Sequence, residues 1–342
     1  MKRKVSMKDI AQKLGVSTAL VSYVLNNQLE DRINKETAEK IRQLAEALNY
    51  QPNHIAKSLK NNKTNTIGLI VADISNPFSA NIARIIEDEA KKSKYTVIFG
   101  SADESYKKSQ DLINVLLSRQ VDGFIIAPAE NSEKQLLLLK KQGVPFVLID
   151  RYFPELDVDR VILNNYKAAY DAVTHLISNG YRRIGMINFN TGLFHLQERV
   201  RGYKEALAQF KAEDLDENFR TVDEKAIKTE VKLRIDELLN KSEAIDALFF
   251  GSNNLAIEGL AYLQSLKIKV PDELAIVCFD EDNAYNLFHC PLSYVKQPLY
   301  EIGRTSVEML LKAIAEGSKN TNVVLDAALM IHESSMAVPE IS

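Results

Sequence analysis

The sequence predicts an α/β protein in which a small all-α domain precedes a larger domain of doubly wound parallel sheets. Three observations lead to this prediction. The chain has 342 residues, more than one hydrophobic core usually holds. Residues 1–60 show helix caps and apolar residues at helical spacing. From residue 66 onward, short apolar runs alternate with amphipathic stretches of helical length.

Charge divides the chain in the same way. Residues 1–64 hold 12 Lys and Arg against 6 Asp and Glu, a net charge of +6, whereas the remainder holds 31 against 40, a net charge of −9. A basic segment ahead of an acidic body indicates that the first domain meets a polyanion. The N-terminus lacks the apolar core of a signal peptide, and no apolar run approaches the ~18 residues of a membrane span. We therefore expect a cytoplasmic protein without a membrane contact.

Helix signals dominate the first domain. Helices are expected over residues 7–14, 18–25 and 35–48. Ser6 and Asp9 form a capping box, Gly15 ends the first helix, and Ser17 and Asn34 can cap the second and third helices. Two helices joined by a tight glycine turn, with a supporting third helix, form the helix-turn-helix pattern of DNA-binding domains.

The second helix would enter the major groove by its N-terminal end. Four of its side chains would then face the DNA bases: Thr18, Ala19, Ser22 and Tyr23. Methyl groups can contact the thymine methyl, and hydroxyls can reach base edges or phosphates. Four hydroxyl or amide side chains suit phosphate contacts: Ser6, Ser17, Ser22 and Asn26. A generic three-helix interaction domain with a basic face is the alternative.

The segment 51–60, QPNHIAKSLK, predicts a helix of about two turns between the domains. Pro52 and Asn53 suit its start, and Ile55, Ala56 and Leu59 lie along one face. A helix this short is marginal in water. Either the segment is a frayed linker, or a partner outside the chain completes it.

Buried parallel strands are predicted where apolar runs occur in the remainder of the chain. These runs cover residues 66–73, 96–103, 123–129, 146–150, 161–165, 183–189, 247–252 and 274–280. Their alternation with helical stretches indicates doubly wound sheets, and their number indicates two lobes.

Ligands of open α/β sheets bind beyond the carboxyl ends of the strands. The candidates at these ends are Asp73, Ser75, Asn76, Phe78, Asp103, Asp150, Arg151, Asn188, Asn190, Ser252, Asn253 and Asp280, and Arg199 stands near a helix start. Carboxylates, amides and an arginine form hydrogen bonds with hydroxyl groups, and Phe78 can pack on a ring face. Local capping, turn formation or a surface ion pair is the alternative role of each polar residue.

Neither a metal site nor an enzyme is expected. The two cysteines, Cys278 and Cys290, and the five histidines lack metal-site spacing. Only His195, which borders the segment around Arg199, is placed to reach the cleft. The sequence contains no phosphate-binding loop, no dinucleotide fingerprint and no nucleophile elbow. We therefore expect no cofactor.

Several segments resemble a known family. MKDIAQKLGVSTALVSYVLN resembles the DNA-binding signature of the LacI/GalR family of bacterial transcription regulators, and NKETAEKIRQLAEALNYQPNHIAKSL resembles its continuation into the hinge. DISNPFSANIARIIEDEA, VILNNYKAAYDAVTHLISNGYRRIGMI, ERVRGYKEAL and YVKQPLYEIGRTSVEMLL resemble the effector domain of that family, which has the periplasmic-binding-protein fold. The resemblance covers essentially the whole chain.

The resemblance implies a helix-turn-helix domain, a hinge helix with its linker, and an effector-binding and dimerisation domain. Their expected bounds are 1–50, 51–64 and 65–342. Lobe one of the effector domain would hold 65–162 and 294–323, and lobe two 163–293 and 324–342. The dimer interface would lie on helices that flank the cleft, and the helix 79–92 is a candidate, although core packing also explains its isoleucines.

By this resemblance the protein is expected to be a repressor that binds a double-stranded, pseudo-palindromic operator as a homodimer. Two hinge helices would pair in the minor groove, and Leu59 would be the wedge in the central base step. The other hinge contacts by matching position are Asn53, Ala56 and Lys57. Tyr23 and Lys57 stand where relatives often carry arginine, so base recognition would differ at those points.

The resemblance also reduces the set of residues expected to contact the effector. The matching positions are Asn76, Phe78, Asp150, Arg199, Ser252, Asn253 and Asp280. Relatives usually carry Asn-Asp or Asn-Asn where this chain has Ser252-Asn253. A sugar or sugar derivative is the expected effector, and an inducer or a corepressor would fill the same cleft. A purine-type corepressor, a protein partner, a transport-type sugar receptor and an enzyme are the alternatives.

Overall fold

The computed structural model describes residues 5–28, 30–50, 63–210 and 217–336. The chain forms two compact units, Met1–Thr64 and Asn65–Ser342. Four hinge residues with expected DNA contacts lie outside the described residues: Asn53, Ala56, Lys57 and Leu59. Their roles therefore stay predictions.

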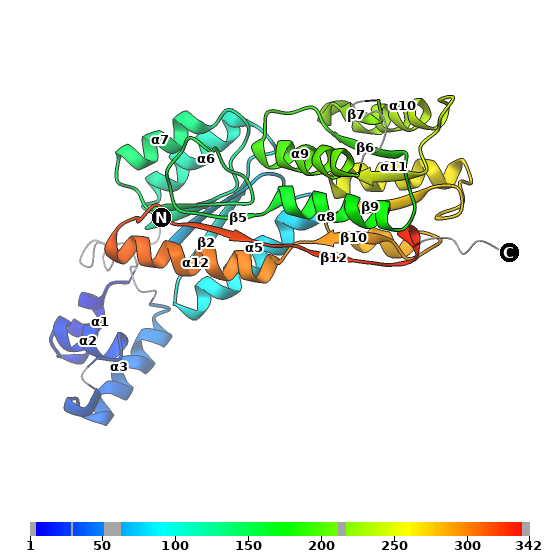
Figure 1. Cartoon of the computed structure of the whole chain (residues 1–342). Coiled ribbons are helices and arrows are strands. Elements are labelled where there is room, and N and C mark those ends of the chain that lie inside the picture. Colours follow the sequence, from blue (N-terminus) through cyan, green and yellow to red (C-terminus); the bar gives the residue numbers. More distant parts are fainter. Residues whose placement is uncertain (1–4, 29, 51–62, 211–216, 337–342) are drawn as a thin grey trace. The chain divides into compact units, whose positions relative to one another are not determined.

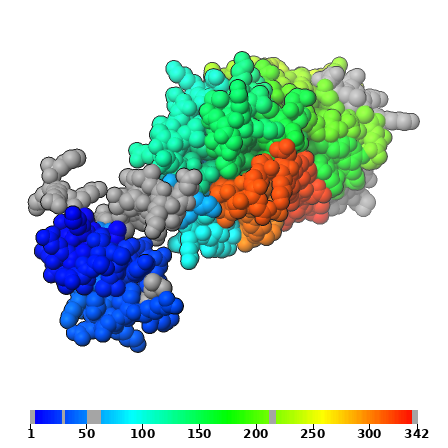
Figure 2. Space-filling model, turned by 90° about the vertical axis from the view of Figure 1, so that its left-hand side faces the viewer, coloured from blue at the N-terminus to red at the C-terminus, as the bar shows by residue number. Residues whose placement is uncertain are grey.

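Three helices lie in the described part of the first unit, which is blue in Figure 2. They are α1 (Met7–Leu14), α2 (Thr18–Leu25) and α3 (Lys35–Ala47), and a 3-10 turn, η1 (Glu30–Arg32), precedes α3. The three helices lie where the sequence places them, and α3 ends one residue earlier than expected.

The helix ends are fixed by the expected caps. The Ser6 hydroxyl accepts from the Asp9 backbone N–H, and the Asp9 carboxylate accepts from the Ser6 backbone N–H at 2.8 Å. Gly15 closes α1 at φ 66°, a left-handed conformation that glycine adopts without steric cost. Ser17 caps α2 and Asn34 caps α3 through their side-chain oxygens. The capping box and both further caps are confirmed.

A small apolar core holds the three helices together. Its buried members are Ile10, Ala11, Val21, Val24, Ile41 and Ala45. Because Val21 and Val24 bury one face of α2, the opposite face of that helix is left for solvent or a partner.

Two six-stranded sheets form the two lobes of the second unit (Figure 1). In lobe one the strands lie in the order β11 (Asn322–Leu325), β5 (Arg160–Leu163), β4 (Phe146–Ile149), β3 (Gly123–Ile126), β1 (Thr66–Val71) and β2 (Thr96–Ser101). In lobe two the order is β12 (Ala328–Met330), β10 (Ser293–Lys296), β9 (Ala275–Phe279), β8 (Ala247–Phe250), β6 (Ile184–Phe189) and β7 (Phe219–Val222). All neighbours are parallel except β10 and β12, which are antiparallel.

Helices cover both faces of each sheet, as a doubly wound fold requires. In lobe one, α5 (Pro77–Lys92) and α12 (Leu299–Glu316) share one apolar core, and α6 (Tyr106–Ser118) and α7 (Glu133–Lys141) share the other. In lobe two the corresponding pairs are α8 (Asn165–Ser178) with α9 (Phe194–Gln209) and α10 (Ile227–Leu239) with α11 (Asn253–Ser265). Short 3-10 turns complete the unit: η2 (Glu224–Ala226), η3 (Asn283–Leu287) and η4 (Glu333–Ser335).

The eight apolar runs correspond to strands β1–β6, β8 and β9, each within a few residues of its expected bounds. Four further strands were not predicted: β7, β10, β11 and β12. All four have only three or four residues. β7 and β10 contain no apolar run longer than two residues, whereas β11 (NVVL) and β12 (ALM) are apolar but have no buried residue and were not recognised as strands.

The chain passes between the lobes three times, at points that differ slightly from the expected ones. β10 (Ser293–Lys296), which the expected bounds divide between the lobes, lies whole in the second sheet. β11 (Asn322–Leu325), also divided by those bounds, lies whole in the first sheet. The apolar pattern of a strand does not specify which sheet it joins, so the sequence did not locate these crossings.

The isoleucines of α5 belong to the core of lobe one. Ile82 and Ile86 are buried, and a Cβ atom at Gly303 on α12 would lie 2.5 Å from Ile85 Cγ2. Glycine at this position therefore allows the close approach of α5 and α12. Core packing therefore accounts for Ile82 and Ile86, and a dimer contact of this helix stays a prediction.

Candidate functional site

The exposed face of α2 carries the residues expected to contact DNA bases. Thr18 and Ala19 in its first turn are exposed, Ser22 is half-buried, and the Tyr23 side chain is 40% exposed. These positions leave the N-terminal part of α2 accessible to a DNA groove. The base contacts themselves stay predictions.

Of the side chains expected to contact phosphates, Ser6, Ser17 and Asn26 are exposed and form local hydrogen bonds. Ser6 Oγ donates to Asp9 Oδ2 at 2.7 Å, and Asn26 Nδ2 donates to the Ser22 carbonyl at 2.8 Å. Ser17 Oγ accepts from the Leu20 backbone N–H at 3.1 Å. Ser17 Oγ, which accepts this cap bond, still carries an O–H donor that suits a phosphate oxygen, whereas the Ser6 O–H already donates to Asp9.

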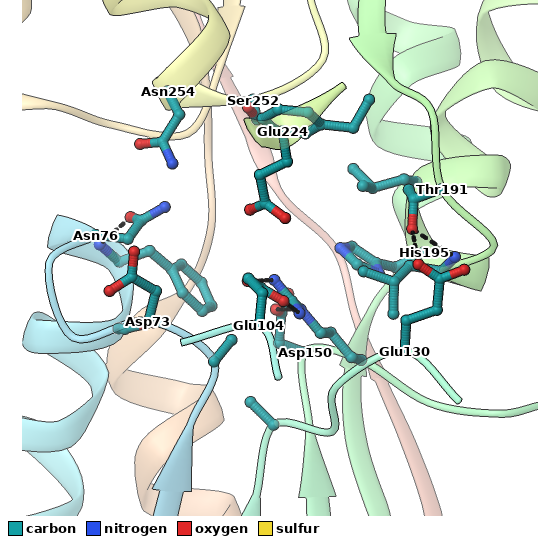
Figure 3. Close-up of a pocket in the computed structure, with 18 of the residues that line it drawn as sticks. Asp73, Asn76, Glu104, Glu130, Asp150, Thr191, His195, Glu224, Ser252 and Asn254 are labelled. Carbon is teal, nitrogen blue, oxygen red and sulfur yellow. Dashed lines mark hydrogen bonds and ion pairs between the residues drawn. The ribbon is translucent and has the colours of Figure 1, made fainter. Parts of the chain in front are cut away.

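A cavity of about 390 Å³ lies between the two lobes (Figure 3). All seven expected effector residues line it: Asn76, Phe78, Asp150, Arg199, Ser252, Asn253 and Asp280. Four other candidates also line it: Asp73, Arg151, Asn190 and His195. Three candidates do not: Ser75, Asp103 and Asn188.

Those three residues have local roles instead. The Ser75 hydroxyl donates to Asp73, the Asp103 carboxylate accepts from Ser101, and the Asn188 amide donates to the Leu196 carbonyl. A position near the end of a strand is therefore insufficient to place a side chain in the cavity.

Two buried aspartates follow strands with the same unusual backbone. Asp150 follows β4 at φ 61°, and Asp280 follows β9 at φ 72°. Both side chains are more than nine-tenths buried. Left-handed backbone at non-glycine residues is uncommon and concentrates at functional sites. It turns each carboxylate out of its strand and toward the space between the lobes.

Burial governs the charge state of these aspartates. It raises the pKa of Asp150 to about 6, against the opposing effect of Arg151 and Arg199, and the negative charges of Asp280 and Glu104 raise it further. Burial likewise raises the pKa of Asp280, whereas Arg199 and the hydrogen bond from Gln297 lower it. That hydrogen bond joins Gln297 Nε2 to Asp280 Oδ1 at 2.6 Å.

Arg199 is held rigidly in lobe two. Its guanidinium donates from Nε to Asn165 Oδ1 at 2.8 Å and from Nη1 to the Gly251 carbonyl at 2.7 Å. Its Cζ lies 3.5 Å from the centroid of the Phe279 ring. A side chain that is 3% exposed and fixed by three contacts has little rotamer freedom left to lose when a ligand binds.

Hydrogen bonds cross between the lobes on both sides of the cavity. The amides of Asn76 and Asn253 exchange two bonds of 3.2 Å each. The Glu130 carboxylate of lobe one accepts from Thr191 Oγ1 of lobe two at 2.9 Å (Figure 3). It also accepts from the Gly192 N–H at 2.9 Å. A change in the angle between the lobes would have to break these bonds.

Three buried polar atoms of residues that line the cavity lack a hydrogen-bond partner among the described residues. They are Arg151 Nε, His195 Nδ1 and Gln297 Oε1, and the last two belong to residues that are 4% and 6% exposed. Burial, Arg199 and Arg151 hold the pKa of His195 well below its usual value, so the imidazole is neutral at pH 7. Buried unpaired polar atoms cost free energy unless a ligand or water pairs with them.

Several residues that line the cavity were missed by sequence reasoning, notably Glu104, Glu130, Glu224 and Gln297. Glu224 follows β7 and Gln297 follows β10, two strands that were not predicted. Glu104 stands one residue beyond Asp103, which was considered. For these three, the strand-end rule would have given the residues if the strands and their ends had been known.

The described part of the chain contains no group of three or more His, Cys, Asp or Glu side chains that could hold a metal ion. Cys278 and Cys290 are buried free thiols. No helix in the same residues is both long enough and apolar enough to cross a membrane.

Two family models match the chain. Residues 6–53 match the bacterial regulatory proteins of the lacI family, and residues 64–333 match the periplasmic binding proteins and sugar binding domain of the LacI family.

Individual proteins are similar over nearly the whole length. A probable HTH-type transcriptional regulator, EndR of Paenibacillus polymyxa, is 33% identical over 90% of each chain. The ribose operon repressor of Haemophilus influenzae is 32% identical over 96% of this chain and 98% of its own. The lac repressor dimer bound to operator and the anti-inducer ONPF shares the fold, with a TM-score of 0.86 at 20% identity over 98% of this chain and 100% of that chain.

Proposed function

The chain belongs to the LacI family of bacterial regulatory proteins, and from this premise we propose that it is a ligand-controlled transcription repressor. The first unit would bind operator DNA, and a small polyhydroxylated effector would bind in the cavity between the lobes. The observation that carries the proposal is the cavity itself, where seven side chains matched to effector contacts meet.

The first unit supports DNA binding through charge and shape. Residues 1–64 carry a net charge of +6, and α2 presents an accessible face above a small core. Phosphate contacts would supply most of the affinity, and the short side chains Thr18, Ala19 and Ser22, with Tyr23, would read bases. The proposed base contacts include no arginine, so specificity would rely on methyl and hydroxyl contacts.

The residues that line the cavity favour a sugar or sugar derivative as the effector. Its carboxylates and amides suit hydroxyl groups, and Phe78 and Phe189 supply aromatic surface for the apolar face of a ring. A purine-type corepressor or a protein partner is the second candidate. We infer no catalytic role, because the fixed charges of the cavity are accounted for by binding.

A homodimer is proposed because a pseudo-palindromic operator has two half-sites, and each half-site binds one helix-turn-helix domain. Exposed apolar side chains on lobe one suit such a contact. Ile98 and Phe99 on the edge strand β2 are 41% and 58% exposed, and Val115 on α6 is 53% exposed. An uncovered apolar edge strand favours pairing with another chain. A protein that binds operator DNA would act in the bacterial cytoplasm.

Coupling would run through the lobes to the hinge. Ligand in the cavity would change the lobe angle and thereby decide whether two hinge helices can pair on DNA, with Leu59 as wedge and Asn53, Ala56 and Lys57 beside it. Effector and operator must then change the affinity of each other by the same factor.

Thermal unfolding of the full chain with sugars, sugar acids, sugar phosphates and purines tests the effector proposal. A ligand at ~100 times its dissociation constant adds about 2.7 kcal/mol, which raises the midpoint by a few degrees. A shift that disappears in Ser252→Ala and persists in Ser118→Ala, a control outside the cavity, would support the site. Shifts that both variants retain would place the ligand elsewhere.

A further inference from the structure

The cavity between the lobes is strongly acidic. Seven carboxylates line it: Asp73, Glu104, Glu130, Asp150, Asp223, Glu224 and Asp280. Three cationic side chains line it: Arg151, Arg199 and Lys225. Its lining therefore carries four more acidic than basic groups. An anionic ligand would enter against this field, and a cationic one would enter with it.

The two arginines already serve protein groups. Arg151 makes two hydrogen bonds to the Glu104 carboxylate, one of them 2.6 Å long. Arg199 is bonded to Asn165 and to a backbone carbonyl and faces the charges of Asp150 and Asp280. Lys225 is exposed and follows two acidic residues. The charge of each arginine is thus already compensated by a carboxylate of the protein. A phosphate or carboxylate group on a ligand would have to compete with that carboxylate.

Glu224 differs from the other carboxylates of the cavity. It stands on η2 of lobe two, and its carboxylate points into the cavity toward lobe one (Figure 3). Across the described residues it forms no hydrogen bond and no ion pair. The residue is exposed overall, but desolvation of the part within the cavity raises its pKa, and the negative charges of Glu104, Asp73 and Asp223 raise it further despite Arg151. Glu224 and Asp73 therefore carry like charges on opposite lobes, and Glu104, although paired with Arg151, adds to the repulsion.

An independent feature indicates that a ligand completes this region. His195 Nδ1 and Gln297 Oε1 line the same cavity, on side chains that are more than nine-tenths buried, and lack partners among the described residues. In Figure 3 the His195 side chain points toward the centre of the cavity, opposite Asp73 and below Glu224. A ligand with several donor groups would satisfy these atoms and the carboxylates together.

We propose that the effector carries an ammonium group, as an amino sugar does, and that Glu224 is the residue that selects it against neutral and anionic sugars. The ammonium group would lie between Glu224 of lobe two and Asp73 and Glu104 of lobe one. It would replace repulsion between the lobes by attraction to both of them, and so favour their closure. This inference rests on the proposed function, because it names the ligand class of the same cavity.

Calorimetric titration of the full chain tests the inference with matched sugars. Each of glucose and galactose is compared with its 2-amino, 2-acetamido, uronic acid and 6-phosphate derivatives at pH 7. The acetamido sugars keep the nitrogen and remove its charge. In at least one series the amino sugar should bind roughly tenfold or more tightly than the neutral parent, as charge-assisted hydrogen bonds do. The uronic acid and the phosphate should bind more weakly than the parent.

Variants assign the preference to Glu224. Glu224→Gln should abolish the preference, so that the variant binds the amino sugar no more tightly than it binds the parent sugar. Glu243→Gln removes the same charge from an exposed residue of lobe two outside the cavity and should change neither affinity. Unchanged thermal midpoints would show that both variants fold.

The outcomes separate this inference from the proposed function. A neutral sugar that binds as tightly as its amino derivative, or an acidic sugar that binds more tightly, overturns the ammonium proposal and leaves a sugar-controlled regulator. An amino-sugar preference that survives in Glu224→Gln overturns the role of that residue. If none of these sugars binds, the result counts against both the ammonium proposal and the sugar effector.

Discussion

Asp150→Asn should stabilise the protein at neutral pH. Asp150 is 7% exposed, and burial raises its pKa from 3.8 to about 6 despite Arg151 and Arg199. A group whose pKa is higher in the folded state stabilises that state at low pH, and the stabilisation is lost as the pH rises through the folded value. A pKa that differs by one between the folded and unfolded states corresponds to about 1.4 kcal/mol of stability. Ionised Asp150 therefore costs about 3 kcal/mol at pH 7.

An asparagine resembles the neutral acid in shape, so the variant should gain most of that free energy. The gain should be below about 1 kcal/mol at pH 4 and rise between pH 4 and pH 6 to about 3 kcal/mol at pH 7. Only the difference in the free energy of unfolding between the variant and the wild type is informative, because other carboxylates titrate in both proteins.

Urea unfolding at a series of pH values, followed by circular dichroism, gives this difference. Tyrosine emission can follow the same transition because the chain has no tryptophan. A variant that is less stable than the wild type at pH 7, or a difference that does not change with pH, would refute the reasoning. The same variant should bind the effector more weakly, since a stability cost at a binding residue is commonly retained for function.

Other predictions follow from single contacts. Arg199→Ala should abolish the effector-induced rise of the thermal midpoint and leave operator affinity without effector intact; a protein that no longer folds would make Arg199 structural. Gly202→Ala should destabilise the second unit by at least about 1–3 kcal/mol in urea unfolding, because its Cβ would lie 2.2 Å from the Tyr166 carbonyl oxygen. Glu130→Ala should open the lobes, because it removes the hydrogen bonds from Thr191 and Gly192, and small-angle scattering without ligand would then give a larger radius of gyration. An unchanged radius would show that these bonds do not hold the lobes together. Ser17→Ala should lower the stability of the first unit by about 1 kcal/mol through loss of the α2 cap, measured by thermal unfolding, and an unchanged midpoint would argue against the cap.

The sequence predicted most of the fold where local signals are strong. Ser6, Gly15 and Ser17 mark helix ends through their own hydrogen bonds or backbone preference, and these ends are confirmed. Central strands such as β4 and β8 are buried along their whole length, so they read as apolar runs. The short strands β7 and β10–β12 are not buried along their whole length, and their positions depend on tertiary pairing.

The site was predicted to the extent that the strands were. Asp150 and Asp280 follow predicted strands, and they line the cavity. Glu224 and Gln297 follow strands that were not predicted, and sequence reasoning missed both. Asn188 lies in a predicted strand but turns to the Leu196 carbonyl, an outcome that only packing decides.

The central claim is that a ligand in the cavity controls operator binding. Double-stranded DNA selected by the full chain from a random library would supply the operator, and fluorescence anisotropy would give its affinity with and without a sugar that raises the thermal midpoint. We expect the sugar to change operator affinity by about 5–150-fold, with no such change in Arg199→Ala or on non-selected DNA. A sugar that binds the wild type through the cavity residues yet leaves operator affinity unchanged would contradict the account.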